Sequence, residues 1–174
     1  MSSPPESEIE WLHIVDACDR PVGIASRDDV HRLKLCHRSV HILIFNRRHE
    51  VLLQRRAAHK TVNPGLWDSS AAGHVEAGES YEMAAKRELS EELGLSDSTL
   101  EPLFTLPPED ETGREWIHLF RGHCEDSARL KPDFQEISAL QWQAANDMDL
   151  RVSREDPELT RTLRKIWHRL MKNR

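Results

Sequence analysis

The 174-residue sequence predicts an α/β fold, and two patterns of side chains indicate it. Runs rich in Val, Ile, Leu and Phe, such as Val40–Phe45 and Val51–Gln54, have the composition and length of β-strands. Segments with apolar side chains three and four residues apart, such as Tyr81–Leu93, are typical of helices. We therefore expect a sheet with helices anchored to it, within one domain.

The strands are expected to be short and separated by turn-forming residues. Polar residues 46–50 lie between the first two runs and predict a hairpin. Residues 16–21 and the sequence Asn63-Pro64-Gly65 predict turns, and residues 107–113 an acidic loop. Further strands are expected at Trp11–Val15, Val22–Ala25, Leu103–Leu106, Trp116–Phe120 and Ala139–Trp142. Three aromatic side chains are expected to pack in the core: Trp67, Trp116 and Phe120.

Three helices are expected, each with recognisable ends. Ser26 can cap a short helix that runs through Leu33, and Gly94 can close the helix at Tyr81–Leu93. The last helix is expected to have Asp156 as its cap and Pro157 in its first turn. Its apolar side chains then share one face, which we expect to pack on the sheet: Leu159, Leu163, Ile166, Trp167 and Leu170.

The composition limits the partners that we expect. The formal net charge is −6, whereas chains that bind nucleic acid through charge alone are usually basic. No apolar run is long enough for a membrane-spanning helix, and residues 1–10 do not resemble a signal peptide. We expect these ten residues to form a flexible tail before a single domain at residues 11–174. Cys18, Cys36 and Cys124 are predicted to be reduced thiols of a cytoplasmic protein.

Three carboxylates of the predicted helix at Tyr81–Leu93 share one face. Glu88, Glu91 and Glu92 are spaced i, i+3 and i+4. Like charges at this spacing repel one another unless a cation lies among them, and carboxylate oxygens suit Mg²⁺ or Mn²⁺. A solvated surface face could show the same spacing, so these three residues alone do not establish a metal site.

The residues around this helix resemble the Nudix box. Gly73, Glu79 and the run Arg87-Glu88-Leu89-Ser90-Glu91-Glu92-Leu93-Gly94-Leu95 fill every defining position of that box in register. The resemblance implies an α/β/α sandwich with a mixed central sheet. It also implies metal-dependent hydrolysis of a nucleoside diphosphate, or a related diphosphate, linked to another group. The metal ligands that it implies are Glu88, Glu91, Glu92 and the backbone carbonyl of Gly73.

The resemblance also implies which residues support the chemistry. Arg87 would orient a glutamate through a charge-assisted hydrogen bond. Glu79 would support the site without binding the metal directly. Glu91 and Glu92 would take part in catalysis on Mg²⁺, or on Mn²⁺, which lowers the pKa of a bound water. The general base stays open between a glutamate of the box and one of Glu109, Asp110, Glu111 and Glu115.

The sequence before the box is similar to isopentenyl-diphosphate isomerases and their hydrolase relatives. The likeness rests on the runs at residues 37–46 and 52–56, on Lys60 and on residues 64–67. It implies that Arg56 and Lys60 contact a substrate diphosphate, and we predict the adjacent Arg55 as a further contact. It also implies a second metal site made by His37, His74 and Glu115, with His31 one residue out of register. The alternative is that these histidines are structural and hydrogen-bonded.

One departure argues against isomerase chemistry. The isomerases have a catalytic cysteine two residues before the histidine that corresponds to His74, and this chain has Ala72 there. The isomerases have also lost most of the Arg-Glu-x-x-Glu-Glu segment, which this chain keeps at residues 87–92. Both differences favour hydrolysis.

The sequence therefore predicts a cytoplasmic, metal-dependent pyrophosphohydrolase with a small-molecule diphosphate substrate. We expect a nucleoside di- or triphosphate, or a nucleoside diphosphate linked to another group. No nucleic-acid or membrane partner is expected, and a homodimer is considered because Nudix proteins are often dimers. Two alternatives stay open: an isopentenyl-diphosphate isomerase variant, which Ala72 disfavours, and a non-catalytic sensor of a nucleotide diphosphate.

Overall fold

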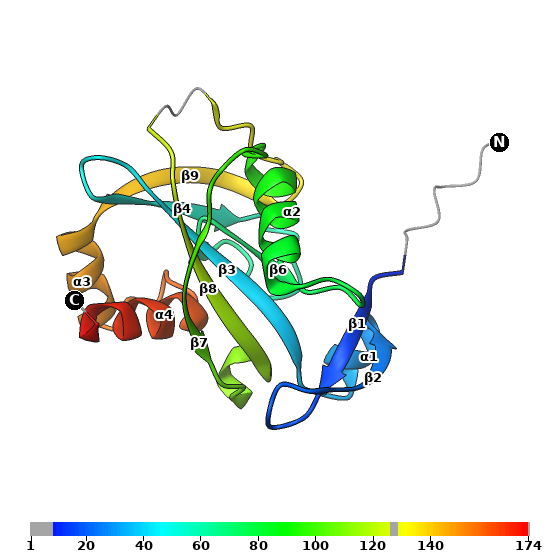
Figure 1. Cartoon of the computed structure of the whole chain (residues 1–174). Helices are drawn as coiled ribbons and strands as arrows, with labels where there is room; N and C mark the ends of the chain where they lie inside the picture. Colours follow the sequence, from blue (N-terminus) through cyan, green and yellow to red (C-terminus); the bar gives the residue numbers. More distant parts are fainter. Residues whose placement is uncertain (1–8, 126–128, 174) are drawn as a thin grey trace.

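A seven-stranded sheet forms the middle layer of the structure, with helices on both of its faces (Figure 1). The computed structural model describes residues 9–125 and 129–173. Helix α2 (Tyr81–Leu93) covers one face, and α3 (Ala145–Ser153) with α4 (Arg161–Lys172) covers the other. The α/β/α sandwich that the sequence predicts is therefore confirmed.

The strands of this sheet pair in a mixed pattern. They are β3 (His37–Phe45), β4 (Glu50–Arg56), β5 (Trp67–Asp68), β6 (Ala71–His74), β7 (Glu101–Leu106), β8 (Glu115–His123) and β9 (Ile137–Ala144). Their order is β5-β4-β3-β8-β7, with β6 paired to β3 and β9 paired to β4. Strands β3 and β8 run parallel, whereas the other pairs of this sheet are antiparallel. The sheet is thus mixed, as predicted.

The sheet divides between β3 and β4, and this division creates the cleft that holds the candidate site. The two strands pair only at Phe45 and Val51, beside their turn. Beyond that point β3 pairs with β6, whereas β4 pairs with β5 and β9. The Ser70 hydroxyl bridges the division, because it accepts from the backbone N–H of Ile44 at 2.8 Å and donates to the carbonyl of Leu52 at 2.5 Å.

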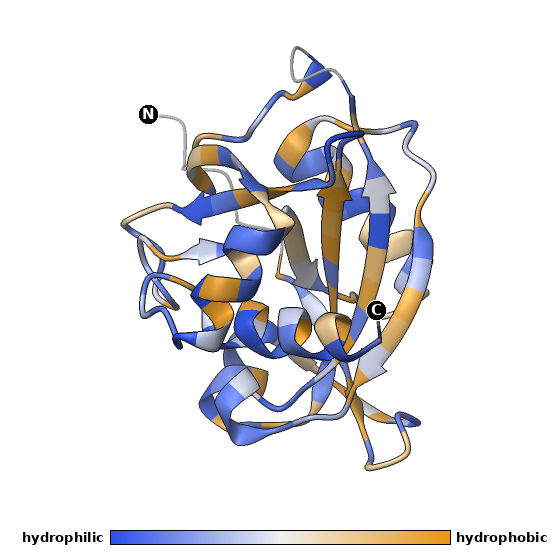
Figure 2. Ribbon diagram, turned by 90° about the vertical axis from the view of Figure 1, so that its left-hand side faces the viewer, coloured by the Kyte–Doolittle hydropathy of each residue, from blue (hydrophilic) through white to orange (hydrophobic). Residues whose placement is uncertain are grey.

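Alternation along the strands builds a core on each face of the sheet. Val40, Ile42 and Ile44 on β3 pack towards α2, and Leu43 between them packs towards α4. The partners of the second core include four fully or almost fully buried residues of α4: Leu163, Ile166, Trp167 and Leu170. The central strands are therefore hydrophobic along much of their length, whereas the helices carry both hydrophobic and hydrophilic residues (Figure 2). The prediction that the last helix packs on the sheet is confirmed.

A small N-terminal unit lies at one end of the sandwich (Figure 1). It consists of β1 (Trp11–Val15) and β2 (Pro21–Ser26), which pair antiparallel, and of α1 (Arg27–Arg32). The Ser26 hydroxyl accepts from the Asp29 N–H at 3.2 Å, so the predicted helix cap is confirmed. Residues 1–8 of the expected tail lie outside the described residues. Glu10 does not fit a flexible tail, because it forms ion pairs with His74 and Arg27.

One prediction about the C-terminal third was wrong, and one helix there was not predicted. Helix α4 begins at Arg161 and is capped by Thr160, whose hydroxyl accepts from the Leu163 N–H at 3.1 Å. Asp156 instead accepts the N–H of Glu158 in a turn that precedes the helix. Helix α3 was not predicted, because Ala144 at its N-cap position supplies no side-chain cap.

Two of the aromatic side chains are half-buried rather than deep in a core. Phe120 is fully buried against α2, as predicted. Trp116 is half-buried and donates its indole N–H to the Asp16 carbonyl at 3.2 Å, which ties β8 to the turn between β1 and β2. Trp67 is also half-buried and packs at the margin of the α4 core.

Among the residues described, no helix has the length and apolar character needed to cross a bilayer.

Candidate active site

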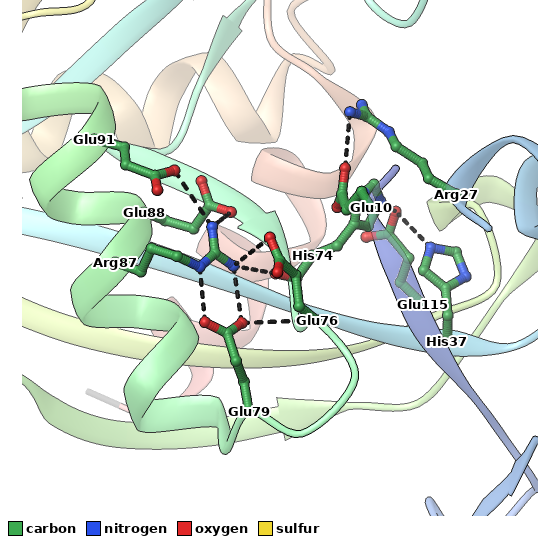
Figure 3. A network of polar contacts seen from close by, with 10 residues as sticks. All are labelled: Glu10, Arg27, His37, His74, Glu76, Glu79, Arg87, Glu88, Glu91 and Glu115. Atoms are coloured by element: carbon green, nitrogen blue, oxygen red, sulfur yellow. Dashed lines mark hydrogen bonds and ion pairs between the residues drawn. The ribbon is translucent and has the colours of Figure 1, made fainter. Parts of the chain in front are cut away.

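Arg87 on α2 is the centre of a carboxylate network (Figure 3). Its Nε and Nη2 donate to the two oxygens of Glu79 at 2.7 and 2.9 Å. Its Nη1 donates to Glu88 at 2.7 Å and to Glu91 at 3.3 Å, and Nη2 also donates to the His74 carbonyl at 3.0 Å. Arg87 therefore fixes α2 against the loop that precedes it and against β6. The Ser80 hydroxyl caps this helix, and Gly94 closes it with a positive φ of 69°.

Gly73 on β6 lies directly under the Glu88 carboxylate. A Cβ atom built on Gly73 would lie 2.0 Å from Oε1 of Glu88 and 2.5 Å from Oε2. Only a residue without a side chain allows the carboxylate to approach the strand so closely. The structure therefore brings together the predicted ligands Gly73 and Glu88.

Glu92 is the most deeply buried carboxylate of the box, with 7% of the residue exposed. Its Oε2 accepts hydrogen bonds from the Gln54 amide at 2.9 Å and from the Ala72 backbone N–H at 3.1 Å. Glu91 is different, because 61% of its side chain is exposed and Arg87 is the partner that holds it. One carboxylate of the box is thus fixed by the sheet, whereas another faces the solvent.

Burial perturbs these carboxylates. Burial, with a further contribution from the charge of Glu91, raises the pKa of Glu88 to about 7 against the opposing effect of Arg87. Burial and the neighbouring charge of Glu88 raise the pKa of Glu92 to about 8. Burial acts to raise the pKa of Glu79, but its hydrogen bonds with Arg87 outweigh that effect and lower it. In the protein without a metal ion, the charged forms of Glu88 and Glu92 are disfavoured. A bound cation would stabilise both groups as anions.

Three histidines form a second cluster beside the box. His31 on α1, His37 on β3 and His74 on β6 have candidate ligand atoms that all lie within 4.8 Å of one another. Oε1 of Glu115 lies 3.6 Å from Nε2 of His37 and 3.9 Å from Nε2 of His74. Burial acts to raise the pKa of Glu115, but the contact with His37 and the charge of His74 lower it to about 2. The structure thus brings together all four residues of the predicted second site.

Residues of both clusters line one cleft of about 1120 Å³ between the two halves of the sheet: Gly73, Glu88, Glu91 and Glu92 from the box, and His31, His74 and Glu115 from the second cluster, with His37 buried behind them. Carboxylates outnumber the lysine and arginine side chains along its wall. The apolar side chains that line it belong, within the described part of the chain, to Ile9, Val62 and Ala72. An anionic ligand would therefore need cations to bind in this cleft, and an apolar ligand would find little apolar surface.

The predicted basic contacts divide between the two sides of β4. Arg56 and Lys60 line the cleft, where Arg56 lies 3.9 Å from Asp68 and Lys60 pairs with Glu136. Arg55 is exposed, donates to the Gly65 carbonyl and lies over the Trp67 ring, outside the cleft lining. Arg55 therefore lies outside the cleft that Arg56 and Lys60 line, because neighbouring strand residues point to opposite faces.

The acidic residues 109–115 that were candidates for the general base lie partly outside the cleft. Glu109 and Glu111 pair with Lys165 on α4, and Asp110 pairs with Arg114. These three residues lie away from the cleft lining, in or beside the short 3₁₀ helix η1 (Asp110–Thr112). These three candidates for the general base therefore lie outside the cleft, whereas Glu115 lines it.

Sequence reasoning missed several residues that the fold brings to the site. Gln54 contacts Glu92 across thirty-eight positions of sequence, and Glu10 holds Nδ1 of His74 at 3.0 Å. Ser39 and His41 line the floor of the cleft from β3, and His41 contacts Ser69 at 2.8 Å. The alternating polar residues at positions 37, 39 and 41 were the available signal, because a strand with one apolar face seldom buries three polar side chains on the other.

These residues fit a divalent metal. Hard carboxylate oxygens converge above a glycine at one end of the cleft, and imidazole nitrogens converge with Glu115 at the other. Nε2 of His37 is buried and has no hydrogen-bond partner, as expected for an atom that binds a metal.

Comparison with known proteins gives the same family at the level of sequence and fold. The NUDIX domain model matches residues 36–164. An uncharacterized Nudix hydrolase of Pseudomonas aeruginosa is 36% identical over 142 residues, which cover 82% of this chain and 83% of that protein. An isopentenyl-diphosphate Delta-isomerase 2 of Photorhabdus laumondii is 35% identical over 138 residues, or 76% of each chain.

The solved structures show the same architecture. The crystal structure of DR0079 from Deinococcus radiodurans matches with a TM-score of 0.80, over 92% of this chain and 98% of that one. Its sequence identity of 24% makes this a likeness of fold. The relatives include both Nudix hydrolases and isopentenyl-diphosphate isomerases, which confirms the predicted branch. The chain belongs to the Nudix family and is a pyrophosphohydrolase.

Proposed function

We propose that this enzyme hydrolyses the diphosphate linkage of a nucleoside di- or triphosphate, or of a nucleoside diphosphate linked to another group, with Mg²⁺ as cofactor. The observation that carries the proposal is that Glu88 lies above Gly73 and Glu92 against the neighbouring Ala72 N–H, in a cleft that also contains Arg56 and Lys60. The ligands that we propose for this metal are Glu88, Glu91, Glu92 and the Gly73 carbonyl.

Each residue of the box has a separate task in this proposal. A divalent cation here would neutralise charge on the phosphoryl oxygens and lower the pKa of a coordinated water. Glu92 is held rigidly by two hydrogen-bond donors, so it would fix the position of the cation. Arg87 holds Glu88 and Glu91 on one face of α2, and Glu79 holds Arg87 in turn. Arg56 and Lys60 would exchange their carboxylate partners for the phosphate oxygens of the substrate.

We propose a second metal site at His37, His74 and Glu115, with His31 as a further ligand. The close approach of all four residues supports it. Glu10 supports it as well, because its contact with Nδ1 of His74 leaves Nε2 directed towards Glu115. The candidates for the general base are then the box glutamates and Glu115.

The polar wall of the cleft supports a nucleotide rather than an isoprenoid substrate. A nucleoside diphosphate carries hydroxyl, amide-like and phosphate groups that suit such a wall, whereas a prenyl chain needs apolar surface. Ala72 adds to this argument, because its methyl group cannot supply the acid of an allylic proton transfer.

A substrate screen tests this proposal. The purified enzyme is assayed with Mg²⁺ or Mn²⁺ against nucleotides, nucleotide sugars, dinucleoside polyphosphates, NAD(H), coenzyme A and isoprenoid diphosphates, and the products are identified by mass. We expect cleavage of at least one nucleoside diphosphate derivative, and EDTA should abolish it. If no diphosphate in the panel is cleaved, the proposal is wrong.

The isomerase is the second candidate, because relatives such as the Photorhabdus laumondii protein carry that name. Conversion of isopentenyl diphosphate to its allylic isomer in D₂O, detected by the deuterium that the product incorporates, would establish it. A sensor would instead bind a nucleoside diphosphate tightly in the same panel without cleaving it. The homodimer and the cytoplasmic location stay predictions.

A further inference from the structure

The carboxylate of Glu92 is held through one of its two oxygens. Oε2 accepts the Gln54 side-chain amide at 2.9 Å and the Ala72 backbone N–H at 3.1 Å. The surrounding sheet fixes the positions of both donors. Ala72 lies in β6, and Gln54 lies in β4 with only 2% of the residue exposed. Within residues 9–125 and 129–173 the hydrogen bonds to this carboxylate reach Oε2, so Oε1 can bind a different partner.

These two donors come from opposite halves of the divided sheet. Ala72 pairs with His41, so it moves with β3 and β6. Gln54 pairs with Asp68 and Leu140, so it moves with β4, β5 and β9. Beyond the turn at Phe45 and Val51 the two halves share no ladder. The position of Glu92 on α2 therefore depends on a hydrogen bond from each side of the cleft.

The chemistry of Gln54 suits a carboxylate that must remain available to a cation. An ionised carboxylate only accepts hydrogen bonds, so the amide must present its NH₂ group to Glu92. An amide donates without positive charge, whereas an arginine or lysine at this position would compete with a metal for the anion. A neutral donor thus orients Glu92 and leaves its charge for the ligand in the cleft.

We propose that Gln54 is a positioning residue for the metal, which orients Glu92 and thereby sets the affinity of the box for a divalent cation. This inference rests on the proposed function, because it takes Glu92 as a metal ligand. Gln54 does not contact the substrate in this account, and its effect passes through Glu92.

The direct test is a Mn²⁺ titration followed by electron paramagnetic resonance, which measures metal binding without turnover. The Gln54→Met variant keeps the length of the side chain and removes the donor. We expect its Kd for Mn²⁺ at the box to rise about tenfold to a hundredfold, the usual effect of losing a hydrogen bond to a metal ligand. The Gln54→Asn variant keeps the amide but shortens its reach, and a similar rise is expected.

Two further variants separate the possible causes. Ser70 also bridges the two halves of the sheet, but its hydroxyl makes its hydrogen bonds with Ile44 and Leu52 rather than with Glu92. Ser70→Ala should therefore lower the thermal stability while leaving the Mn²⁺ affinity near that of the wild type. Glu92→Gln should weaken Mn²⁺ binding at least as much as the Gln54 variants do.

The outcomes distinguish this inference from the proposed function. If Glu92→Gln weakens Mn²⁺ binding but both Gln54 variants bind like the wild type, Gln54 has no positioning role. If Ser70→Ala weakens binding as much as Gln54→Met, the effect belongs to the packing of the cleft and the inference is also wrong. If Glu92→Gln itself binds Mn²⁺ like the wild type, the proposed metal site fails. Should Gln54→Met not fold, as judged by circular dichroism, Gln54→Asn decides the question.

Discussion

Arg87 and Glu79 form a two-point contact, in which Nε and Nη2 of the guanidinium donate to the two carboxylate oxygens at 2.7 and 2.9 Å. The planar guanidinium can do this while its third nitrogen holds Glu88 and Glu91. The contact thus couples the loop before α2 to the proposed metal ligands on the helix.

The first prediction concerns this contact. Arg87→Lys keeps the charge but cannot serve Glu79, Glu88 and Glu91 together, because an ammonium group lacks the planar fork of donors. We expect kcat to fall about tenfold to a hundredfold, with a weaker apparent affinity for Mg²⁺. Steady-state kinetics at several Mg²⁺ concentrations measure both. Arg48→Lys, at an exposed turn residue paired with Glu50, should behave like the wild type. Wild-type kinetics for Arg87→Lys would contradict the role of the fork.

The second prediction uses the close approach of Glu88 to Gly73. In Gly73→Ala the new methyl group would lie 2.0 Å from the carboxylate, so Glu88 must move away from the strand. We expect Mg²⁺-dependent activity to fall at least tenfold and the stability to fall by about 1–3 kcal/mol. Gly23→Ala is the matched strand control, because its methyl group would lie 3.7 Å from the Ile14 side chain. Activity is measured with the best substrate and stability by urea denaturation. Full activity in Gly73→Ala would show that the position of Glu88 is unimportant.

The third prediction concerns the second metal site. His37→Gln removes an imidazole whose buried Nε2 has no hydrogen-bond partner. We expect the variant to bind one Mn²⁺ ion fewer per chain than the wild type, as measured by equilibrium dialysis and metal analysis. His168→Gln, at an exposed position on α4, should leave the number unchanged. If His37→Gln binds as many ions as the wild type, the histidine cluster is structural.

The fourth prediction is the pH dependence of stability without metal. In the folded chain burial raises the pKa of Glu92 to about 8, from an ordinary value of 4.5. Between about pH 5 and pH 8 the folded state therefore binds more protons than the unfolded state. The contribution of Glu92 to the free energy of unfolding accordingly decreases as the pH rises across this range. The Tm of the wild type minus that of Glu92→Gln, measured in EDTA, should therefore decrease across this range. Parallel curves would mean that Glu92 titrates normally. Mg²⁺ should raise the wild-type Tm more at the upper end of the range, because a cation replaces the proton.

The sequence predicted the elements that have strong local signals. Ser26, Gly94 and the apolar face of the last helix acted as expected, because caps and helical periodicity depend on residues a few positions apart. The start of that helix was misplaced for the same reason. Asp156 and Pro157 resemble a cap locally, but the Asp68 carboxylate accepts the Thr160 hydroxyl and helps to fix the cap four residues later.

The box could be predicted from the sequence because its spacing lies within one segment. Contacts across the divided sheet could not, since no local pattern tells that Gln54 meets Glu92 or that Glu10 meets His74. Arg55 shows the opposite problem. The likeness to the isomerases covered both arginines of β4, and only the strand geometry separates the one that faces the cleft.

The most direct test of the account compares the wild type with Glu92→Gln on the panel compound that is cleaved best. Hydrolysis in Mg²⁺ and ¹⁸O-labelled water is followed by mass spectrometry of the phosphate products. The account predicts that the wild type incorporates one ¹⁸O atom per cleavage, and that the variant loses at least about a hundredfold in rate while its circular dichroism spectrum is unchanged. A folded Glu92→Gln variant that cleaves the same compound at the wild-type rate would contradict it.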